Sequence, residues 1–196
     1  NYDQGYKPDF PDESDFRGQI VHPQHWPEDL DYTGKKVVVI GSGATAITLV
    51  PTMAEKAAHV TMLQRSPTYL MPLPSTDKLT LALQKILPEK TAYRLTRARN
   101  IAISRFLYQR SRKSPQFMRR LFLSIIKRKV GDTADMRHFT PDYNPWDQRL
   151  CVVKDGDLFQ AMKAGKAAIA TDHIDRFTET GIRLKSGEEL AADIII

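Results

Sequence analysis

The sequence has a single cysteine, Cys151, among 196 residues. One cysteine excludes an intramolecular disulfide and a cysteine-rich zinc site, and it is typical of a reducing compartment. No run approaches the roughly 18 apolar residues that a membrane-spanning helix needs. The opening residues also lack the basic and apolar regions of a secretory signal. We therefore expect a globular protein of the cytoplasm.

Both ends of the sequence lack features of a complete protein. The chain begins with Asn rather than Met, and it ends on residues 191–196 (AADIII), inside an expected β run with no turn or cap after it. We therefore expect a piece of a larger protein, so that function has to be inferred for the parent.

Acidic side chains are missing from residues 91–130. Twelve Lys or Arg lie there among Leu, Ile and Phe, whereas the other 156 residues hold 17 basic and 23 acidic side chains. Three interpretations stay open: helices whose apolar stripe packs on the domain, contact with an acidic face of another domain or subunit, and peripheral attachment to anionic lipid. Nucleic acid is not expected as a partner, because no recognised binding motif accompanies the arginines.

The order of the apolar runs predicts an α/β fold. Residues 37–40 form a β-branched run typical of a central parallel strand; a glycine turn, a helix to about residue 58 and a strand over 59–64 complete a βαβ unit. Residues 78–130 read as helices divided by prolines, and later strands are expected at 167–170, 174–178, 182–184 and 189–196, the last two as a hairpin. We predict a three-layer Rossmann-like NAD(P)-binding domain with a helical insertion.

A glycine-rich turn directly follows the first strand. Its pattern Gly41-x-Gly43-x-x-Ala46 matches the dinucleotide fingerprint, in which the glycines let backbone N–H groups approach a pyrophosphate at a helix N-terminus. The predicted cofactor-binding residues here are Gly41, Ser42, Gly43, Ala44 and Thr45. The alternative is a glycine turn without a ligand.

The residues that end the second strand indicate which dinucleotide binds. NAD-binding folds usually place Asp or Glu there, whereas this chain has Gln64, Arg65 and Ser66. An arginine can pair bidentately with a 2′-phosphate, which a carboxylate would repel. We therefore predict NADPH as the cofactor, with these three residues at its 2′-phosphate; the alternative for Arg65 is a solvated surface arginine.

The segment before the βαβ unit carries the pattern F-x-G-x-x-x-H-x-x-x-W-P at Phe16, Gly18, His22, Trp26 and Pro27. This pattern resembles the fingerprint of type I Baeyer–Villiger monooxygenases, in the flavin-containing monooxygenase superfamily, and within them the ethionamide-activating group. From the residues alone, a histidine beside a tryptophan in a proline-rich loop is most simply structural. The resemblance implies that His22 couples domain motion to catalysis, in a linker over residues 1–34.

The resemblance also implies a second cofactor and a domain outside this chain. Such enzymes bind FAD in one dinucleotide fold and NADPH in another, and only the second glycine motif is present. Residues 35–196 would then be the NADP-binding domain, with a basic helical insertion at about 78–130. Its partner would be the FAD domain of the same parent chain. We expect the isolated chain to hold no FAD and to be inactive.

The resemblance assigns the catalytic role to Arg149, which ends the segment 143–149 and would stabilise negative charge that develops beside the flavin. Gln148 stands where many members have a lysine for the 2′-phosphate, which leaves more of that task to Arg65. The alternative for Arg149 is a salt bridge within the loop, to Asp147 or Asp142.

The parent is thus expected to be an FAD- and NADPH-dependent monooxygenase. It would insert one atom of O₂ into a ketone or a sulfur or nitrogen centre, with a ketone or thio-compound as substrate. Two alternatives stay open: a heteroatom-oxidising flavin monooxygenase without ketone chemistry, and a non-catalytic NADP-binding module.

Overall fold

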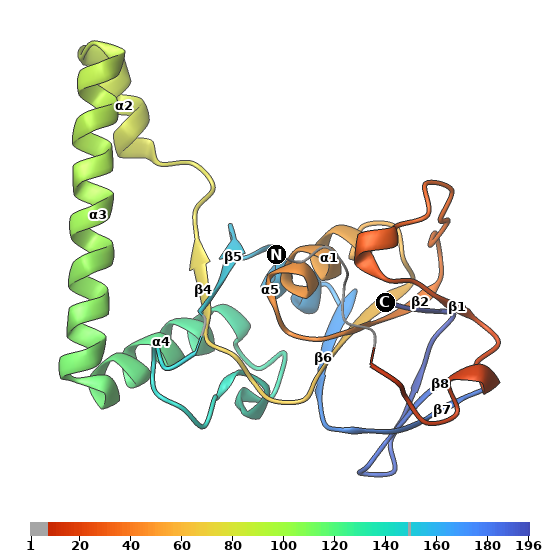
Figure 1. Cartoon of the computed structure of the whole chain (residues 1–196). Helices are drawn as coiled ribbons and strands as arrows, with labels where there is room; N and C mark the ends of the chain where they lie inside the picture. Colours follow the sequence, from red (N-terminus) through yellow and green to blue (C-terminus); the bar gives the residue numbers. More distant parts are fainter. Residues whose placement is uncertain (1–7, 149) are drawn as a thin grey trace.

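A parallel five-stranded sheet forms the centre of the computed structural model, which describes residues 8–148 and 150–196 (Figure 1). Its strands in spatial order are β1 (Gln19–Ile20), β10 (Ile194–Ile195), β2 (Lys36–Ile40), β3 (His59–Gln64) and β6 (Ala167–Thr171). The valines of β2 are buried, as expected of a strand covered on both faces. The predicted βαβ unit is therefore confirmed at the middle of the sheet.

Helices α1 (Ala44–Ala54) and α5 (Asp157–Lys163) cover one face of this sheet. Helix α4 (Pro115–Val130) packs against α5, and apolar side chains of all three helices join those of β2, β3 and β6 in the largest buried cluster. Helix α1 ends four residues earlier than the predicted helix, because the chain turns there to enter β3.

A small antiparallel sheet covers the opposite face. Its strands are β7 (Ile174–Thr178), β8 (Gly181–Leu184) and β9 (Glu189–Ala191), in that order. Phe177, Ile182 and Leu184 pack there against Val38 and Leu63 of the central strands. The predicted three-layer α/β fold is confirmed, and its third layer is a sheet.

The predicted hairpin strand over 189–196 is wrong in its second half. Strand β9 pairs with β8, but β10 leaves that sheet and enters the central one between β1 and β2. Asp193 directs this crossing, because its carboxylate accepts a 2.7 Å hydrogen bond from the Lys36 N–H and its backbone N–H donates to the Lys36 carbonyl at 2.8 Å. Strand β1, which belongs to the linker expected over residues 1–34, pairs with β10.

A second, two-stranded parallel sheet joins the helical insertion to the domain. Strand β4 (Leu70–Leu73) precedes the insertion and pairs with β5 (Cys151–Lys154), which follows it. Tyr69, Met118 and Phe122 form a buried cluster where α4 meets β4. These two strands were not predicted, and they close the base of the insertion.

The insertion contains α2 (Lys78–Ile86), α3 (Glu89–Lys113) and α4, separated at Pro88 and Pro115 as predicted. Helix α4 buries Met118, Phe122, Ile126 and Val130 on the domain. In contrast, α2 and α3 project from it, and their described residues bury only Ala92 and Ser111 (Figure 1). The packed apolar stripe is therefore confirmed for α4 and wrong for α2 and α3, which we call the helical arm (residues 78–113).

Asp77 joins the two helices of the arm. Its carboxylate accepts hydrogen bonds from the Leu79 and Thr80 N–H groups at 3.1 and 3.2 Å, which caps α2, and it pairs with Arg99 of α3. The hydroxyls of Thr80 and Thr96 lie 3.2 Å apart and add a second link. Among the described helices, none is long and apolar enough to cross a membrane.

The Asp77 pairing predicts a pH-dependent stability of the arm. The Arg99 hydrogen bond, and then that of Thr80, lowers the pKa of Asp77. A lowered pKa stabilises the folded state above the unfolded value of about 3.9, and this contribution is lost as the pH falls toward the folded value. We expect Asp77→Asn to lower the urea midpoint of unfolding at pH 7, followed by circular dichroism, with a difference that shrinks below about pH 4.

The control is Asp132→Asn, which removes an exposed carboxylate just after α4. It should leave the midpoint unchanged at both pH values. A difference for Asp77→Asn that stays constant, or grows, on acidification would contradict the pairing.

Candidate dinucleotide-binding site

The glycine turn lies at the carboxyl end of β2 and leads directly into α1. Gly41 has a φ of 125°, a region that side chains with a Cβ rarely adopt, and its N–H donates to the Leu63 carbonyl of β3 at 2.7 Å. Gly43 caps α1 without offering a side-chain acceptor, and the first turn of α1 holds no acidic residue. A Cβ at Gly43 would meet no atom within 4 Å. The helix N-terminus is thus open to an approaching anion.

A cavity of about 560 Å³ lies on one side of this turn, and we call it the arginine pocket. Its polar lining includes Gly41 and Ser42 of the turn, Arg65 and Ser66 after β3, His173 after β6, Lys185 after β8, and the carboxylate of Asp9 near the start of the described chain. Four of the predicted cofactor positions, Gly41, Ser42, Arg65 and Ser66, therefore line one cavity, as the shared edge of β2 and β3 requires. Asp172 also lines the pocket.

Asp172 is tied to the backbone around it. Its carboxylate accepts hydrogen bonds from the His173 N–H at 2.6 Å and the Ser186 N–H at 3.0 Å. Hydrogen bonding from Ser186 lowers the pKa of Asp172, so the group is anionic at neutral pH and already paired with two donors. The Lys185 N–H donates to the His173 carbonyl at 2.9 Å, which holds the two residues together.

Sequence reasoning missed His173 and Lys185. His173 lies in the short connection between β6 and β7, and Lys185 follows a short strand of the antiparallel sheet. A signal for His173 was present, because it follows β6, a parallel strand next to β3, at the edge where ligands bind in such sheets. Nothing in the local pattern at Lys185 indicated its place.

Gln64 lies below the pocket and not on its surface. Its side chain is 1% exposed, and its amide donates to the His138 carbonyl at 2.7 Å and to the Thr171 hydroxyl at 2.8 Å. The predicted contact of this side chain with a cofactor is therefore corrected: the amide joins the ends of β3 and β6. Burial lowers the pKa of the neighbouring His138, whose Nδ1 lies 2.7 Å from the same hydroxyl.

A second cavity of about 710 Å³ lies on the other side of the turn. Ser42, Gly43 and Ala44 line it together with Gln148 and Cys151. The Cys151 thiol donates to the Ser42 carbonyl at 3.7 Å, which ties the turn to β5. Gln148 is thus beside the phosphate turn, whereas the predicted catalytic residue Arg149 lies outside the described residues.

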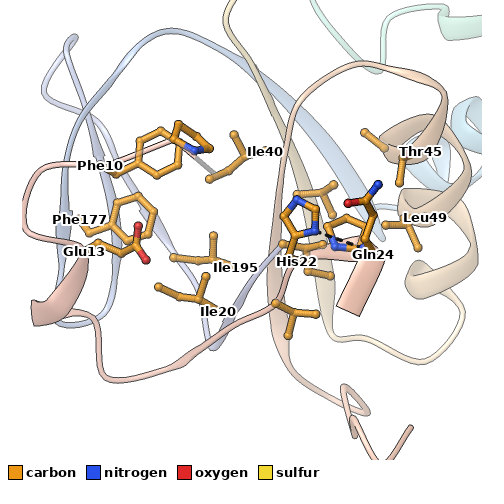
Figure 2. A pocket seen from close by; sticks show the side chains of 16 residues that line it. Phe10, Glu13, Ile20, His22, Gln24, Ile40, Thr45, Leu49, Phe177 and Ile195 are labelled. Carbon is orange, nitrogen blue, oxygen red and sulfur yellow. Dashed lines mark hydrogen bonds between the residues drawn. The ribbon is translucent and has the colours of Figure 1, made fainter. Parts of the chain in front are cut away.

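A third, mostly apolar cavity of about 520 Å³ brings His22 to the same helix end (Figure 2). Its lining includes Ile20 and His22 from the linker and Thr45 and Leu49 from α1. His22 is half-buried, and its Nδ1 accepts a 3.2 Å hydrogen bond from the Gln24 N–H, which caps the short helix Pro23–His25. Figure 2 shows the imidazole between the linker and the first turns of α1. Of the residues predicted to bind the cofactor, Thr45 alone lines this cavity with His22.

Two other members of the linker pattern have structural roles. Phe16 packs edge-on against Phe177, with ring centroids 6.3 Å apart. A Cβ at Gly18 would lie 2.3 Å from the Asp193 carbonyl oxygen, so only glycine fits between β1 and the crossing to β10.

Within residues 8–148 and 150–196, no group of three or more His, Cys, Asp or Glu could hold a metal ion.

A family model of flavin-binding monooxygenase-like proteins matches residues 5–133, which is more than half of the chain. The chain belongs to the flavin-binding monooxygenase-like family. Over its whole length it is 59% identical to the probable FAD-binding monooxygenase AlmA of Acinetobacter baylyi. It is 58% identical to the putative FAD-containing monooxygenase MymA and 56% identical to the FAD-containing monooxygenase EthA, both of Mycobacterium tuberculosis. The chain spans 40% of the length of each of these relatives.

Solved structures of monooxygenases share the fold of this family member. A steroid monooxygenase bound to NADP superposes with a TM-score of 0.71 at 23% identity, over 97% of this chain and 44% of that one. The complex of OTEMO with FAD and NADP superposes with a TM-score of 0.71 at 21% identity, over 98% of this chain and 44% of that one. The predicted fold class and family resemblance are confirmed by these comparisons.

We expect alanine substitutions at Gly18 and Gly43 to have opposite effects on stability and on NADPH binding. Gly18→Ala forces a methyl group into the Asp193 carbonyl and should cost about 1–3 kcal/mol in the free energy of unfolding. Gly43→Ala has an allowed backbone conformation and open space, so it should change that free energy by at most about 1 kcal/mol while weakening the binding of NADPH. Urea unfolding and calorimetric titration measure the two effects.

Each variant serves as the control for the other. A Gly18→Ala variant as stable as the wild type would contradict the close approach of β1 and the crossing. Unchanged NADPH affinity in Gly43→Ala would contradict the turn as a phosphate site.

Proposed function

We propose that this chain is the NADPH-binding part of an FAD-dependent monooxygenase. The observation that carries the proposal is the arginine pocket, in which a glycine turn at a helix N-terminus and the side chains of Arg65, Ser66 and Lys185 line one cavity. The 56–59% identity with AlmA-, MymA- and EthA-type relatives over the whole chain supports the parent activity. Residues 1–34 would form the linker and 35–196 the NADP-binding domain.

The donors present fit a phosphorylated dinucleotide. Backbone N–H groups of Gly43 and Ala44 at the start of α1 would bind the pyrophosphate, with Ser42 beside them. Arg65 and Ser66 would hold the 2′-phosphate, since a guanidinium donates to two phosphate oxygens at once and a hydroxyl adds one bond. Asp172 is anionic, but backbone donors already bind its carboxylate, and the positive charges of Arg65 and Lys185 in the same cavity oppose its repulsion of a phosphate.

FAD is proposed to bind outside this chain. The sequence carries one strand–glycine turn–helix unit, which the NADPH site uses. In such an enzyme NADPH would reduce FAD by hydride transfer, and the reduced flavin would activate O₂, so that one oxygen atom goes to a ketone or to a sulfur or nitrogen centre and the other leaves as water. We propose the ketone reaction first; conversion of ketone to ester by the parent would distinguish it from heteroatom oxidation alone.

Two residues of this chain are proposed to act at the flavin side of the site. His22 would be a positioning residue, since it lines one cavity with Thr45 and so links the motion of the linker to the phosphate turn. Arg149 would stabilise negative charge on the reacting oxygen and substrate. Its sequence neighbour Gln148 borders the turn, which supports a place for this loop beside the cofactor.

The choice of NADPH over NADH is tested by Arg65→Ala. Loss of a charge-assisted hydrogen-bond pair should weaken NADPH binding about 10- to 100-fold and leave NADH binding within about twofold. Calorimetric titration of the chain with each nucleotide measures both. The matched control is Arg176→Ala, an exposed arginine on β7 that does not line the pocket. Equal losses for the two nucleotides would contradict a 2′-phosphate role.

The role of Arg149 is tested in the parent enzyme with Arg149→Ala. Product formation should fall by a hundredfold or more, while reduction of FAD by NADPH stays near the wild-type rate, because the proposed charge acts only after hydride transfer. Stopped-flow absorbance of the flavin and product analysis separate the two steps, and Arg149→Lys should recover part of the product. Retained product formation in Arg149→Ala would rule out this role.

A further inference from the structure

The helical arm exposes an unusual amount of apolar surface. Ile86, at the tip between α2 and α3, is 81% exposed, and Phe106 and Tyr93 of α3 are 65% and 60% exposed. Other exposed apolar side chains of the arm are Leu79, Leu81, Leu95, Ile101, Ile103 and Tyr108. Helix α3 has 25 residues and is therefore about 37 Å long, so this surface extends well away from the domain. Large exposed apolar patches mark sites of interaction with a protein or a membrane.

The same surface is strongly cationic. Residues 78–113 hold ten Lys or Arg and a single acidic residue, Glu89. Within the described residues, Arg99 pairs with Asp77 and Arg112 with Asp147, and no other cation of the arm has an ionic partner. Lys85, Lys90 and Arg94 flank the exposed tip. The arm therefore offers a large uncompensated positive charge.

Apolar and cationic residues alternate along α3. Spacings of three or four residues place Arg97, Ile101 and Arg105 in one row, and Arg99, Ile103 and Phe106 in another. An acidic protein face would pair the guanidinium groups but leave the isoleucines in a polar contact. A nucleic-acid backbone accepts the cations and has no place for Ile86.

We propose that the helical arm docks on an anionic lipid surface, with its tip at Ile86 inserted among the headgroups. The lipid interface takes both kinds of side chain at different depths: apolar groups enter the acyl boundary, while lysines and arginines reach up to the phosphates. Each cation near an anionic membrane contributes about a fivefold gain in partitioning. The link between Asp77 and Arg99 holds α2 and α3 together as one inserting unit.

The proposal extends to the placement of the site. The arm is attached through β4 and β5, and β5 lines the cavity beside Gln148 and the phosphate turn. Docking would hold this side of the domain near the bilayer, where apolar substrates accumulate. The proposed docking on lipid does not depend on the identity of the cofactor.

Flotation with lipid vesicles tests the docking. The full chain is mixed with vesicles of phosphatidylcholine alone, or with about 30 mol % phosphatidylglycerol, at about 0.05 M and about 0.5 M NaCl. We expect binding to the anionic vesicles at low salt, at least tenfold weaker binding at high salt, and little binding to neutral vesicles. Absence of binding to anionic vesicles at low salt would overturn the proposal.

Variants locate the contact on the arm. The triple change Lys85→Gln, Lys90→Gln and Arg94→Gln should weaken binding about a hundredfold. Ile86→Ser should weaken it roughly tenfold through lost apolar insertion. The matched controls are Lys163→Gln with Lys166→Gln, exposed cations of the domain, and Leu73→Ser, an exposed apolar side chain of β4. Equal losses from the control and arm variants would overturn the assignment to the arm.

Insertion is measured separately with a tryptophan at the tip. In Ile86→Trp, brominated acyl chains should quench the added fluorescence, whereas Leu73→Trp should stay unquenched. Circular dichroism checks that each variant is folded. Quenching that is equal at the two positions, or binding to duplex DNA that is tighter than to anionic vesicles, would contradict docking on lipid.

Discussion

The parallel pairing of β2 with β3 is the constraint on which the site depends. Ile40 lies opposite Leu63, so β2 and β3 end at the same level, and the Gly41 N–H donates to the Leu63 carbonyl just beyond. Because β6 is paired with β3 in the same direction, Thr171 also ends at this edge. The glycine turn, Arg65 and the His173 segment therefore meet without any of them being near the others in the sequence. A slip of β3 by one residue would move Arg65 away from the turn and turn its neighbours to the opposite face.

The third layer and the linker depend on Asp193, where the chain crosses from the antiparallel sheet into the central sheet. This residue accepts from and donates to Lys36 while its carbonyl accepts from Gln19, so it binds β1, β2 and the start of β10 together. Phe16 and Gly18 of the linker pattern fit around the same point. As a result, His22 is carried to the first turns of α1, on the side away from the arginine pocket. The sequence pattern that suggested the family thus has a packing explanation at Phe16 and Gly18. Its third position, His22, lies near the start of α1.

The elements that could be predicted are those whose interactions join residues close together in the sequence. The unit β2–α1–β3 and the breaks at Pro88 and Pro115 were predicted, because β-branched runs, glycines and prolines act on nearby residues. Strands β4 and β5 were missed, since each is four residues long and its partner lies about 80 residues away. Packing on the domain was only one of three interpretations left open for the apolar positions of α3, because their pattern indicates a surface to be covered and not what covers it.

The candidate site likewise divides into residues that a local pattern identifies and residues that only long-range packing brings there. Gly41, Gly43 and Arg65 were predicted because each belongs to a pattern with a stated mechanism. Gln64 stands next to Arg65 yet faces the core, a consequence of the strand alternation that sends successive side chains to opposite faces. Lys185 reaches the pocket only through the antiparallel sheet, whose position no local pattern indicates.

The central claim is that this turn and this pocket form one nucleotide site. Amide chemical shifts of the ¹⁵N-labelled chain, followed while NADP⁺ is added, test it most directly. The account predicts that saturable shifts concentrate at Gly41–Thr45, Arg65, Ser66, His173 and Lys185, with those of the helical arm unchanged. Saturable shifts that leave these residues untouched, or no shifts at all in a folded chain, would contradict it.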